Sequence, residues 1–288
     1  MPQPFTPAGA RSRNAAASGR FFTEVMDRCL QQVLANTRDI DAGTKDEELV
    51  HQLRVGLRRL RTALRELSDF SPDIDPEWEV AFRGAFRALG IHRDAVTMLP
   101  ALRKEMRREG IRAVKFRKPS PASRTPEAVV RDPQFQHALQ GVMAFCRAVP
   151  PTAGGKGARR RLKKDIAARL ARLHDDVKPD AMHFDKLSPS RQHRLRKRVK
   201  RMRYLAEFAA PLFDARRVDR YVKRWRAAQN ELGDNHDYRV GLDSLRKGAP
   251  GIESTCATRW ILARIRNCAP RCNAALRKAV KRPCFWED

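Results

Sequence analysis

The sequence of 288 residues lacks a run of about 18 uncharged apolar residues, the minimum for a membrane-spanning helix, and its N-terminal stretch lacks the apolar core of a secretory signal. Cysteine is also scarce: six residues are spread over the chain, so we expect no disulfide framework. Cys268 and Cys272 could share a helix face, but no neighbouring Cys or His supplies the two further ligands that zinc takes. These absences predict a soluble, cytoplasmic protein with reduced thiols, no metal, no other cofactor and no membrane partner.

Acidic residues are few relative to basic ones. The chain has 33 Asp and Glu against 60 Lys and Arg, which gives a formal net charge of +27 and a pI of 11.0. Such an excess of positive charge favours a polyanionic partner. Hydrophobic residues make up 42% of the sequence, enough to build a globular core, so we expect a folded protein.

Strand-like alternation is scarce as well, whereas apolar residues recur at helical spacing almost throughout. We therefore predict an all-α fold that follows a disordered basic tail over residues 1–19. The basic, proline-rich residues 112–133 are expected to form an exposed loop. Helices are predicted over residues 21–40, 46–71, 77–99 with a possible continuation past Pro100, 134–149, 158–177, 191–213, 221–245 and from 253 onward.

The Pro- and Gly-rich residues 150–157 divide the chain almost in half and are predicted to be a linker. Four helical segments lie on each side, and their motifs match. HxLRxxxRRLR at residues 51–61 corresponds to HxLRxxxKRMR at residues 193–203, and LGxxRD at residues 89–94 corresponds to LGxxHD at residues 232–237. We infer an internal duplication, with two four-helix bundles at residues 20–149 and 158–287 related by a pseudo-two-fold axis.

A helical wheel places basic residues along one stripe of each matching helix. The first basic stripe, within roughly 80° of His51, consists of His51, Arg54, Arg58, Arg61 and Arg65. The second basic stripe takes the same angular positions and consists of His193, Arg196, Lys200 and Arg203. Leucine and other apolar residues occupy the adjoining sector, so each stripe should border the core.

Residues 51–65 contain five Arg and residues 191–204 contain eight Lys or Arg, and neither stretch contains Asp or Glu. Like charges at this spacing repel by about 0.2–0.5 kcal/mol per pair. A bound polyanion would offset the repulsion, and the planar fork of arginine suits phosphate oxygens. We predict that both stripes bind phosphate; an idle, solvated surface is the alternative.

The LGxxRD and LGxxHD motifs contribute a carboxylate each. Asp94 and Asp237 are expected to accept hydrogen bonds from arginines of a neighbouring helix, with a catalytic role as the alternative. Gly90 and Gly233 lie inside helical patterns, where Gly costs about 1 kcal/mol relative to Ala. Close approach of two helices would justify that cost.

In combination, HQLRVGLRRLRTALREL, LGIHRDAV, LRKRVKRMRYLAEF, NELGDNHDYRV and the C-terminal KRPCFW resemble the CHAD family, the conserved histidine α-helical domain, over about residues 20–287. The resemblance implies two four-helix bundles around a basic central channel, binding of long-chain inorganic polyphosphate and recruitment to polyphosphate granules. By position, the resemblance assigns phosphate binding to His51, Arg54, Arg58 and Arg61 of the first stripe. In the second stripe it assigns the same role to His193, Arg196, Lys200 and Arg203. Supporting residues expected nearby are Arg59, Arg93, Asp94, Arg201, Tyr204, His236 and Asp237.

Two departures from the repeat stand out: Glu207 occupies the position of Arg65, and His236 that of Arg93. The Glu-x-Glu-x-Lys signature of the triphosphate tunnel domains that often accompany this family does not occur. We therefore expect a binding protein that is not an enzyme.

Two other functions compete with this expectation. A nucleic-acid-binding protein is possible on charge alone, but aromatic residues make up 7% of the chain and only Tyr204 lies beside a stripe, so surfaces for base stacking are poorly supplied. A phosphohydrolase would use Asp94, Asp237 and the histidines with a divalent metal, which needs closely spaced carboxylates. No acidic cluster adjoins the stripes in the sequence.

Overall fold

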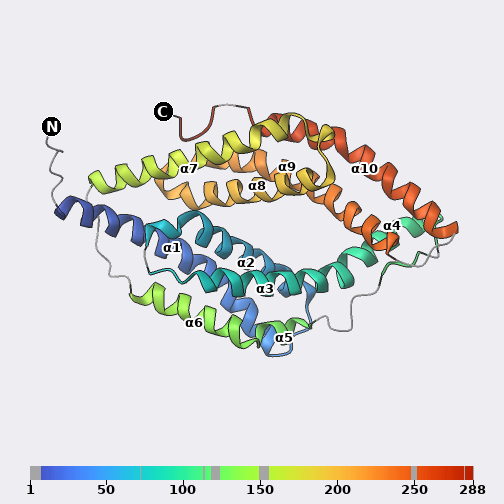
Figure 1. The fold of residues 1–288 in the computed structure, drawn as a ribbon, viewed down its shortest axis with the longest axis horizontal. Coiled ribbons are helices and arrows are strands. Elements are labelled where there is room, and N and C mark those ends of the chain that lie inside the picture. The colour runs from blue at the N-terminus through green and yellow to red at the C-terminus, as the bar shows by residue number, and fades with distance from the viewer. Residues whose placement is uncertain are drawn as a thin grey trace. The chain divides into compact units, whose positions relative to one another are not determined.

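The computed structural model describes residues 8–71, 73–112, 114–117, 124–148, 156–247, 252–281 and 283–287. Within these ranges every regular element is a helix, which confirms the all-α prediction (Figure 1). None of the helices found there combines the length and the apolar character needed to span a bilayer. The α-helices are α1 (Ala8–Asp41), α2 (Glu47–Leu67), α3 (Pro76–Arg93), α4 (Leu99–Arg108), α5 (Pro126–Val130), α6 (Pro133–Ala148), α7 (Lys156–Met182), α8 (Pro189–Ala209), α9 (Ala215–Arg246) and α10 (Ile252–Ala279).

Helix starts follow their capping residues. The Asp46 side chain accepts a hydrogen bond from the backbone of Glu48 at the start of α2. Ser188 caps α8 in the same way, with Pro189 in the first turn. Asp214 caps α9 through the N–H of Arg217, so this helix begins six residues before the predicted residue 221. The apolar spacing that predicted this helix begins only at Tyr221 and does not include the cap.

The predicted N-terminal tail is wrong over residues 8–19, which belong to α1. The alanine-rich sequence of this stretch has high helix propensity, which the analysis of composition overlooked. Residues 1–7 and residues 150–155 of the predicted linker lie outside the described ranges, and Lys156 and Gly157 begin α7. Helix α7 also continues past Pro179 to Met182, beyond its predicted end at residue 177.

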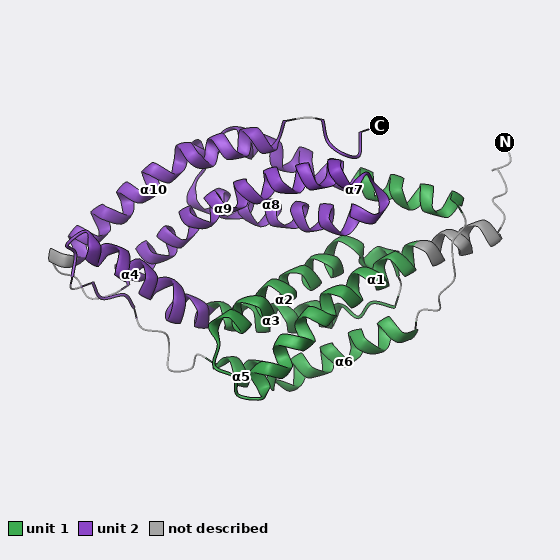
Figure 2. Cartoon of the chain, turned by 180° about the vertical axis from the view of Figure 1, so that it is seen from behind, with its two compact units in different colours: residues 1–90, 124–168 green, residues 91–123, 169–288 purple. Residues whose placement is uncertain are grey.

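The chain forms two compact units (Figure 2). Unit 1 is Met1–Gly90 and Arg124–Ala168, and unit 2 is Ile91–Ser123 and Arg169–Asp288. The units therefore alternate along the chain and do not coincide with the halves expected on either side of the linker. The pseudo-two-fold relation and the central channel stay predictions.

The third predicted helix does continue past Pro100, through a π-helical segment at Asp94–Met98 that joins α3 to α4. Here the N–H of Leu99 donates to the carbonyl of Asp94, five residues earlier. Proline lacks an N–H and its ring collides with the carbonyl four residues back in a regular helix. The wider turn before Pro100 accommodates both effects and keeps the chain helical.

The prediction of an exposed loop over residues 112–133 is wrong in two places. Val114 and Phe116 are buried in a hydrophobic cluster of unit 2 that includes Leu102, Met106, Leu242, Leu245, Ala257 and Ile261. Near its end the stretch forms α5, which is capped by Thr125 and buries Val129. Apolar residues alternating with basic ones gave the stretch a polar average that concealed its buried side.

Candidate anion-binding site

The first basic stripe lies where the wheel placed it, at the border between the core and solvent. Arg54, Arg58 and Arg61 are partly exposed, and His51 and Arg65 are exposed. The adjoining face of α2 is buried in unit 1 through Leu53, Leu57, Leu60, Leu64 and Leu67. The periodicity of α2 thus correctly separated its basic and apolar faces.

A single aromatic ring gathers three arginines of this stripe. The guanidinium carbons of Arg54, Arg58 and Arg61 lie 4.6, 5.3 and 5.3 Å from the ring centroid of Phe86 on α3. The Nη1 atom of Arg54 also donates to the Phe86 carbonyl at 2.9 Å. Cation–π contacts of this kind hold guanidinium groups against the ring face. Sequence analysis missed Phe86 because it looked for aromatic residues only on the basic helices.

Gly90 makes room for one of these arginines. A Cβ atom at this position would lie 2.7 Å from Nη1 of Arg54, closer than atoms in contact can approach. The glycine was predicted to allow close approach of two helices. It instead leaves room for the Arg54 side chain, which passes over it. Gly233, the matching residue of the second half, has nothing within 4 Å of a built Cβ, so nothing in the described contacts explains it.

A carboxylate from α3 neutralises the C-terminal end of the first basic stripe. Glu79 accepts hydrogen bonds from Arg61, with Nη2–Oε1 at 2.8 Å, and pairs with Arg65 at 3.2 Å. Burial lowers the pKa of the Arg61 guanidinium, and Glu79 partly offsets this shift. The acid that residues 51–65 lack is thus supplied by the neighbouring helix α3.

The second basic stripe also borders a core, formed on α8 by Leu195, Val199, Met202 and Ala206. His193, Arg196 and Lys200 are partly exposed, whereas Arg203 is buried, with 7% of its surface accessible. Arg59 and Arg201, the flanking basic residues of the two motifs, are partly exposed.

Arg203 is held inside the protein by polar and aromatic groups. Its Nε donates to Oε1 of Gln229 at 2.9 Å, and its Nη1 pairs with Glu207, which also pairs with Arg226 at 3.5 Å. The guanidinium lies over the ring of Tyr204, which is only 2% exposed. Tyr204 therefore belongs to the core of unit 2 and presents no exposed face for base stacking.

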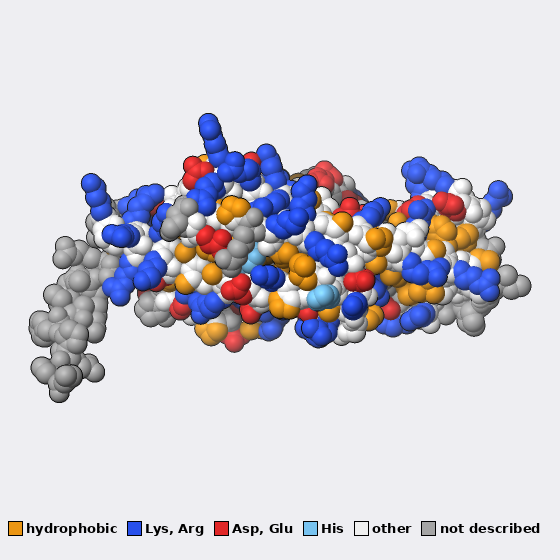
Figure 3. Space-filling view, turned by 90° about the horizontal axis from the view of Figure 1, so that it is seen from above, with side chains coloured by type: hydrophobic (Ala, Val, Ile, Leu, Met, Phe, Trp, Pro, Cys, Tyr) orange, Lys and Arg blue, Asp and Glu red, His pale blue; other side chains and the backbone are white. Residues whose placement is uncertain are grey.

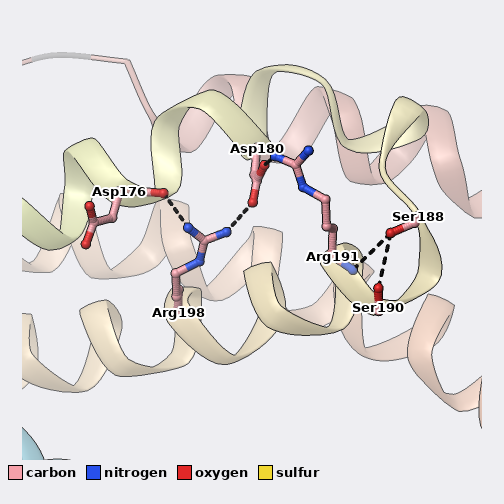
Figure 4. Close-up of polar contacts among 6 residues, drawn as sticks. All are labelled: Asp176, Asp180, Ser188, Ser190, Arg191 and Arg198. Carbon is pink, nitrogen blue, oxygen red and sulfur yellow. Dashed lines mark hydrogen bonds and ion pairs between the residues drawn. The ribbon is translucent and has the colours of Figure 1, made fainter.

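Other basic residues of α8 pack against α7. Arg191 and Arg198 both pair with the buried carboxylate of Asp180, and Arg198 donates to the carbonyl of Asp176 at 2.6 Å (Figure 4). Asp180 therefore neutralises part of a charge run that looked uncompensated in the sequence. The repulsion inferred from α8 alone is smaller in the folded protein.

The second stripe begins with a pair of imidazoles. The rings of His193 on α8 and His236 on α9 have centroids 5.1 Å apart and planes 32° apart. Burial, reinforced by Arg196, His193, Lys200 and Arg93, lowers the pKa of His236 to about 3. Burial and the nearby Lys197, Arg196 and Lys200 also lower the pKa of His193. Both rings are therefore mainly uncharged at neutral pH, within a strongly positive environment.

The two carboxylates of the repeated motif meet at one arginine. Arg93 donates from Nη2 to Asp237 and from Nη1 to Asp94, both at 3.3 Å. Although burial lowers it, the pKa of Arg93 is raised on balance by Asp237 and Asp94. The expected contact with an arginine of a neighbouring helix is found for Asp237, whereas the arginine that contacts Asp94 is its neighbour in the sequence. In the part of the chain with described placement, no three His, Cys, Asp or Glu side chains form a cluster suited to a metal ion.

Lys and Arg side chains project over much of the face drawn in Figure 3, as the net charge leads one to expect. The stripes differ from this general surface because they occupy matching positions and are arranged by specific partners. Each combines a histidine, partly exposed basic side chains and at least one arginine held by a carboxylate.

Comparisons with known proteins agree with this architecture. The family model of the CHAD domain matches residues 24–246, about three quarters of the chain. The crystal structure of the CHAD domain from the plant Ricinus communis superposes with a TM-score of 0.70 at 22% sequence identity, covering 93% of this chain and 92% of that one. A comparison with curated proteins finds no match.

Proposed function

The chain belongs to the CHAD domain family, and on this basis we propose that it binds long-chain inorganic polyphosphate through the two basic stripes, without hydrolysing it. The observation that carries the proposal is the convergence of Arg54, Arg58 and Arg61 on the ring of Phe86. Three like charges held this close together favour the binding of an anion.

The spacing of the three arginines suits a linear ligand. Each guanidinium lies within 5.3 Å of one centroid, so any two are less than about 11 Å apart. Along the helix axis, Arg54 and Arg61 are separated by about 10 Å, at 1.5 Å per residue. A chain of linked phosphates can follow such a row, whereas a single phosphate can contact only part of it. Each guanidinium can hold two phosphate oxygens.

We assign the ligand contacts mainly to the N-terminal parts of the stripes. Arg61 and Arg203 already have carboxylate partners, Glu79 and Glu207, so their role is to complete the positive surface from a fixed position. We assign the main contacts of the first stripe to His51, Arg54 and Arg58, which are exposed or partly exposed. The matching contacts of the second stripe are His193, Arg196 and Lys200.

The contacts of Asp94 and Asp237 support binding without catalysis. Both carboxylates accept hydrogen bonds from Arg93, an arrangement that suits positioning of a basic side chain. We further propose that affinity for polyphosphate brings the protein to polyphosphate granules in the cell.

Charge reversal at Arg58 tests the site. R58E should weaken binding to long polyphosphate by about tenfold or more, because a hydrogen bond to a charged group contributes about 1.5–3 kcal/mol. R112E is the matched control: it changes the net charge equally, and Arg112 is exposed and outside both stripes. Filter binding at fixed ionic strength measures both variants.

Competition with nucleic acid tests the ligand. At equal phosphate concentration, polyphosphate should displace duplex DNA and RNA from the wild-type protein. Preferential retention of DNA or RNA would support the nucleic-acid alternative, and equal losses in R58E and R112E would mean that net charge, not the stripe, governs binding.

A further inference from the structure

His236 gives the second basic stripe a feature that the first lacks. In the repeated motif this position is an arginine in the first half, Arg93, and a histidine in the second. The His236 ring lies against that of His193, 5.1 Å away between centroids. Two titratable rings thus lie where the strongest anion contacts of unit 2 are expected.

The groups that face this pair are nearly all cationic. The cations are Arg196, Lys197 and Lys200 on α8 and Arg93 at the end of α3. The acid Asp237 follows His236 in the sequence of α9. Asp237 already accepts a hydrogen bond from Arg93. Burial is the main reason that both imidazole pKa values are lowered. In the free protein a proton on either ring also adds a positive charge to a positive cluster, which lowers the two pKa values further.

We propose that the His193–His236 pair takes up protons when a polyanion binds, so that the affinity of the protein for polyphosphate rises as the pH falls. The proposal rests on the proposed function and specifies how this half of the site responds to pH. A phosphate chain beside Arg196 and Lys200 replaces the repulsion on the rings by attraction. The charged imidazole then becomes an additional hydrogen-bond donor to the ligand.

The direction of the effect follows from proton linkage. The complex binds more protons than the free protein, so lowering the pH favours the complex between the two pKa values of each ring. For His236 the free value is about 3. If the bound ring regains an ordinary histidine pKa of about 6.5, affinity rises about tenfold from pH 7.5 to 5.5.

The test measures polyphosphate binding and proton uptake together. Isothermal calorimetry of the wild-type protein with long-chain polyphosphate, in buffers of different ionisation enthalpy at pH 6, counts the protons taken up. Affinities at pH 7.5 and 5.5 give the slope independently. Long chains are used because their inner phosphate groups stay ionised over this range, so the ligand itself contributes little.

Three variants assign the protons. In H236Q the gain in affinity from pH 7.5 to pH 5.5 should be about tenfold smaller than in the wild type, and fewer protons should be taken up on binding. H236R carries a permanent charge, as Arg93 does in the first half, and its affinity should also depend less on pH. This variant replaces H236Q in the test if circular dichroism shows that H236Q is unfolded. H137Q removes an exposed histidine of α6, outside the stripes, and should retain the wild-type slope.

The outcomes separate this proposal from the proposed function. Tight binding by the wild-type protein without proton uptake, or an unchanged slope in both His236 variants, refutes proton uptake by the pair and leaves polyphosphate binding intact. Absence of polyphosphate binding at both pH values refutes the proposed function itself.

Discussion

Replacing Gly90 by alanine should weaken polyphosphate binding without destabilising the protein. The new Cβ would lie 2.7 Å from Nη1 of Arg54, whereas ordinary contact begins at 3.4 Å. The guanidinium must therefore move by at least about 0.7 Å, a shift that a flexible side chain can make at small energetic cost. Its hydrogen bond to the Phe86 carbonyl, now 2.9 Å, lengthens or breaks.

Two opposing contributions set the effect of G90A on stability. Alanine favours the helix by about 1 kcal/mol relative to glycine, and loss of one hydrogen bond costs about 0.5–1.5 kcal/mol. The free energy of unfolding should thus change by less than about 1 kcal/mol. Binding should fall about tenfold, since displacement of Arg54 removes one charge-assisted contact worth about 1.5 kcal/mol.

G233A provides the matched control. Gly233 occupies the same position of the repeat, and a built Cβ there meets nothing within 4 Å. This variant should gain about 1 kcal/mol of stability from helix propensity and bind polyphosphate as the wild type does. Urea unfolding and filter binding on both variants measure the two quantities. Unchanged binding in G90A would show that the placement of Arg54 over Phe86 does not matter for the ligand.

Two further substitutions separate charges that bind from charges that stabilise. E79Q should raise polyphosphate affinity several-fold, because it removes a carboxylate that competes with the ligand for Arg61 and Arg65. Loss of the same ion pairs should lower the unfolding free energy by about 1 kcal/mol. A reduced affinity in filter binding would contradict this view. D180N should lower the unfolding free energy by about 1–2 kcal/mol in urea titrations, since the buried carboxylate joins two partly exposed arginines of α8 to α7. Its polyphosphate affinity should stay within about twofold of the wild-type value.

The sequence allowed a correct prediction of what depends on one helix at a time. The 3.6-residue period placed Leu53, Leu57 and Leu60 in the core and Arg54 and Arg58 at its border, because a helix fixes the angle between its own residues. The matching motifs of the two halves were also visible in the sequence, and the duplication inferred from them stays a prediction. The family resemblance then connected these patterns to a fold that the comparisons confirm.

What could not be predicted depends on contacts between helices. Glu79 and Asp180 neutralise arginines of α2 and α8 from positions far away in the sequence, which no wheel of a single helix reveals. The same limit applied to Phe86. Its spacing of four residues from both Phe82 and Gly90 was a usable signal, because residues four apart share a helix face. That pattern could have indicated that α3 turns this face toward α2.

The differences between the two halves form a consistent exchange of charge. In the first half Arg61 pairs with Glu79 on α3, and Arg65 lies one turn further along α2. In the second half the position of Arg65 holds an acid, Glu207, and the position of Glu79 holds Val222. The carboxylate has thus moved from the third helix to the basic helix itself.

The arginines that this carboxylate contacts nevertheless occupy matching positions in the two halves. Glu79 contacts Arg61 and Arg83, at 2.8 and 3.9 Å, and Glu207 contacts their counterparts Arg203 and Arg226. Glu207, which looked like a defect in a phosphate site when only α8 was considered, replaces an acid that the first half draws from α3. Because each half retains one carboxylate at the C-terminal end of its stripe, that end has the same electrostatic role in both. The differences that bear on the ligand therefore lie at the other end, where Phe86 is replaced by Gln229 and Arg93 by His236.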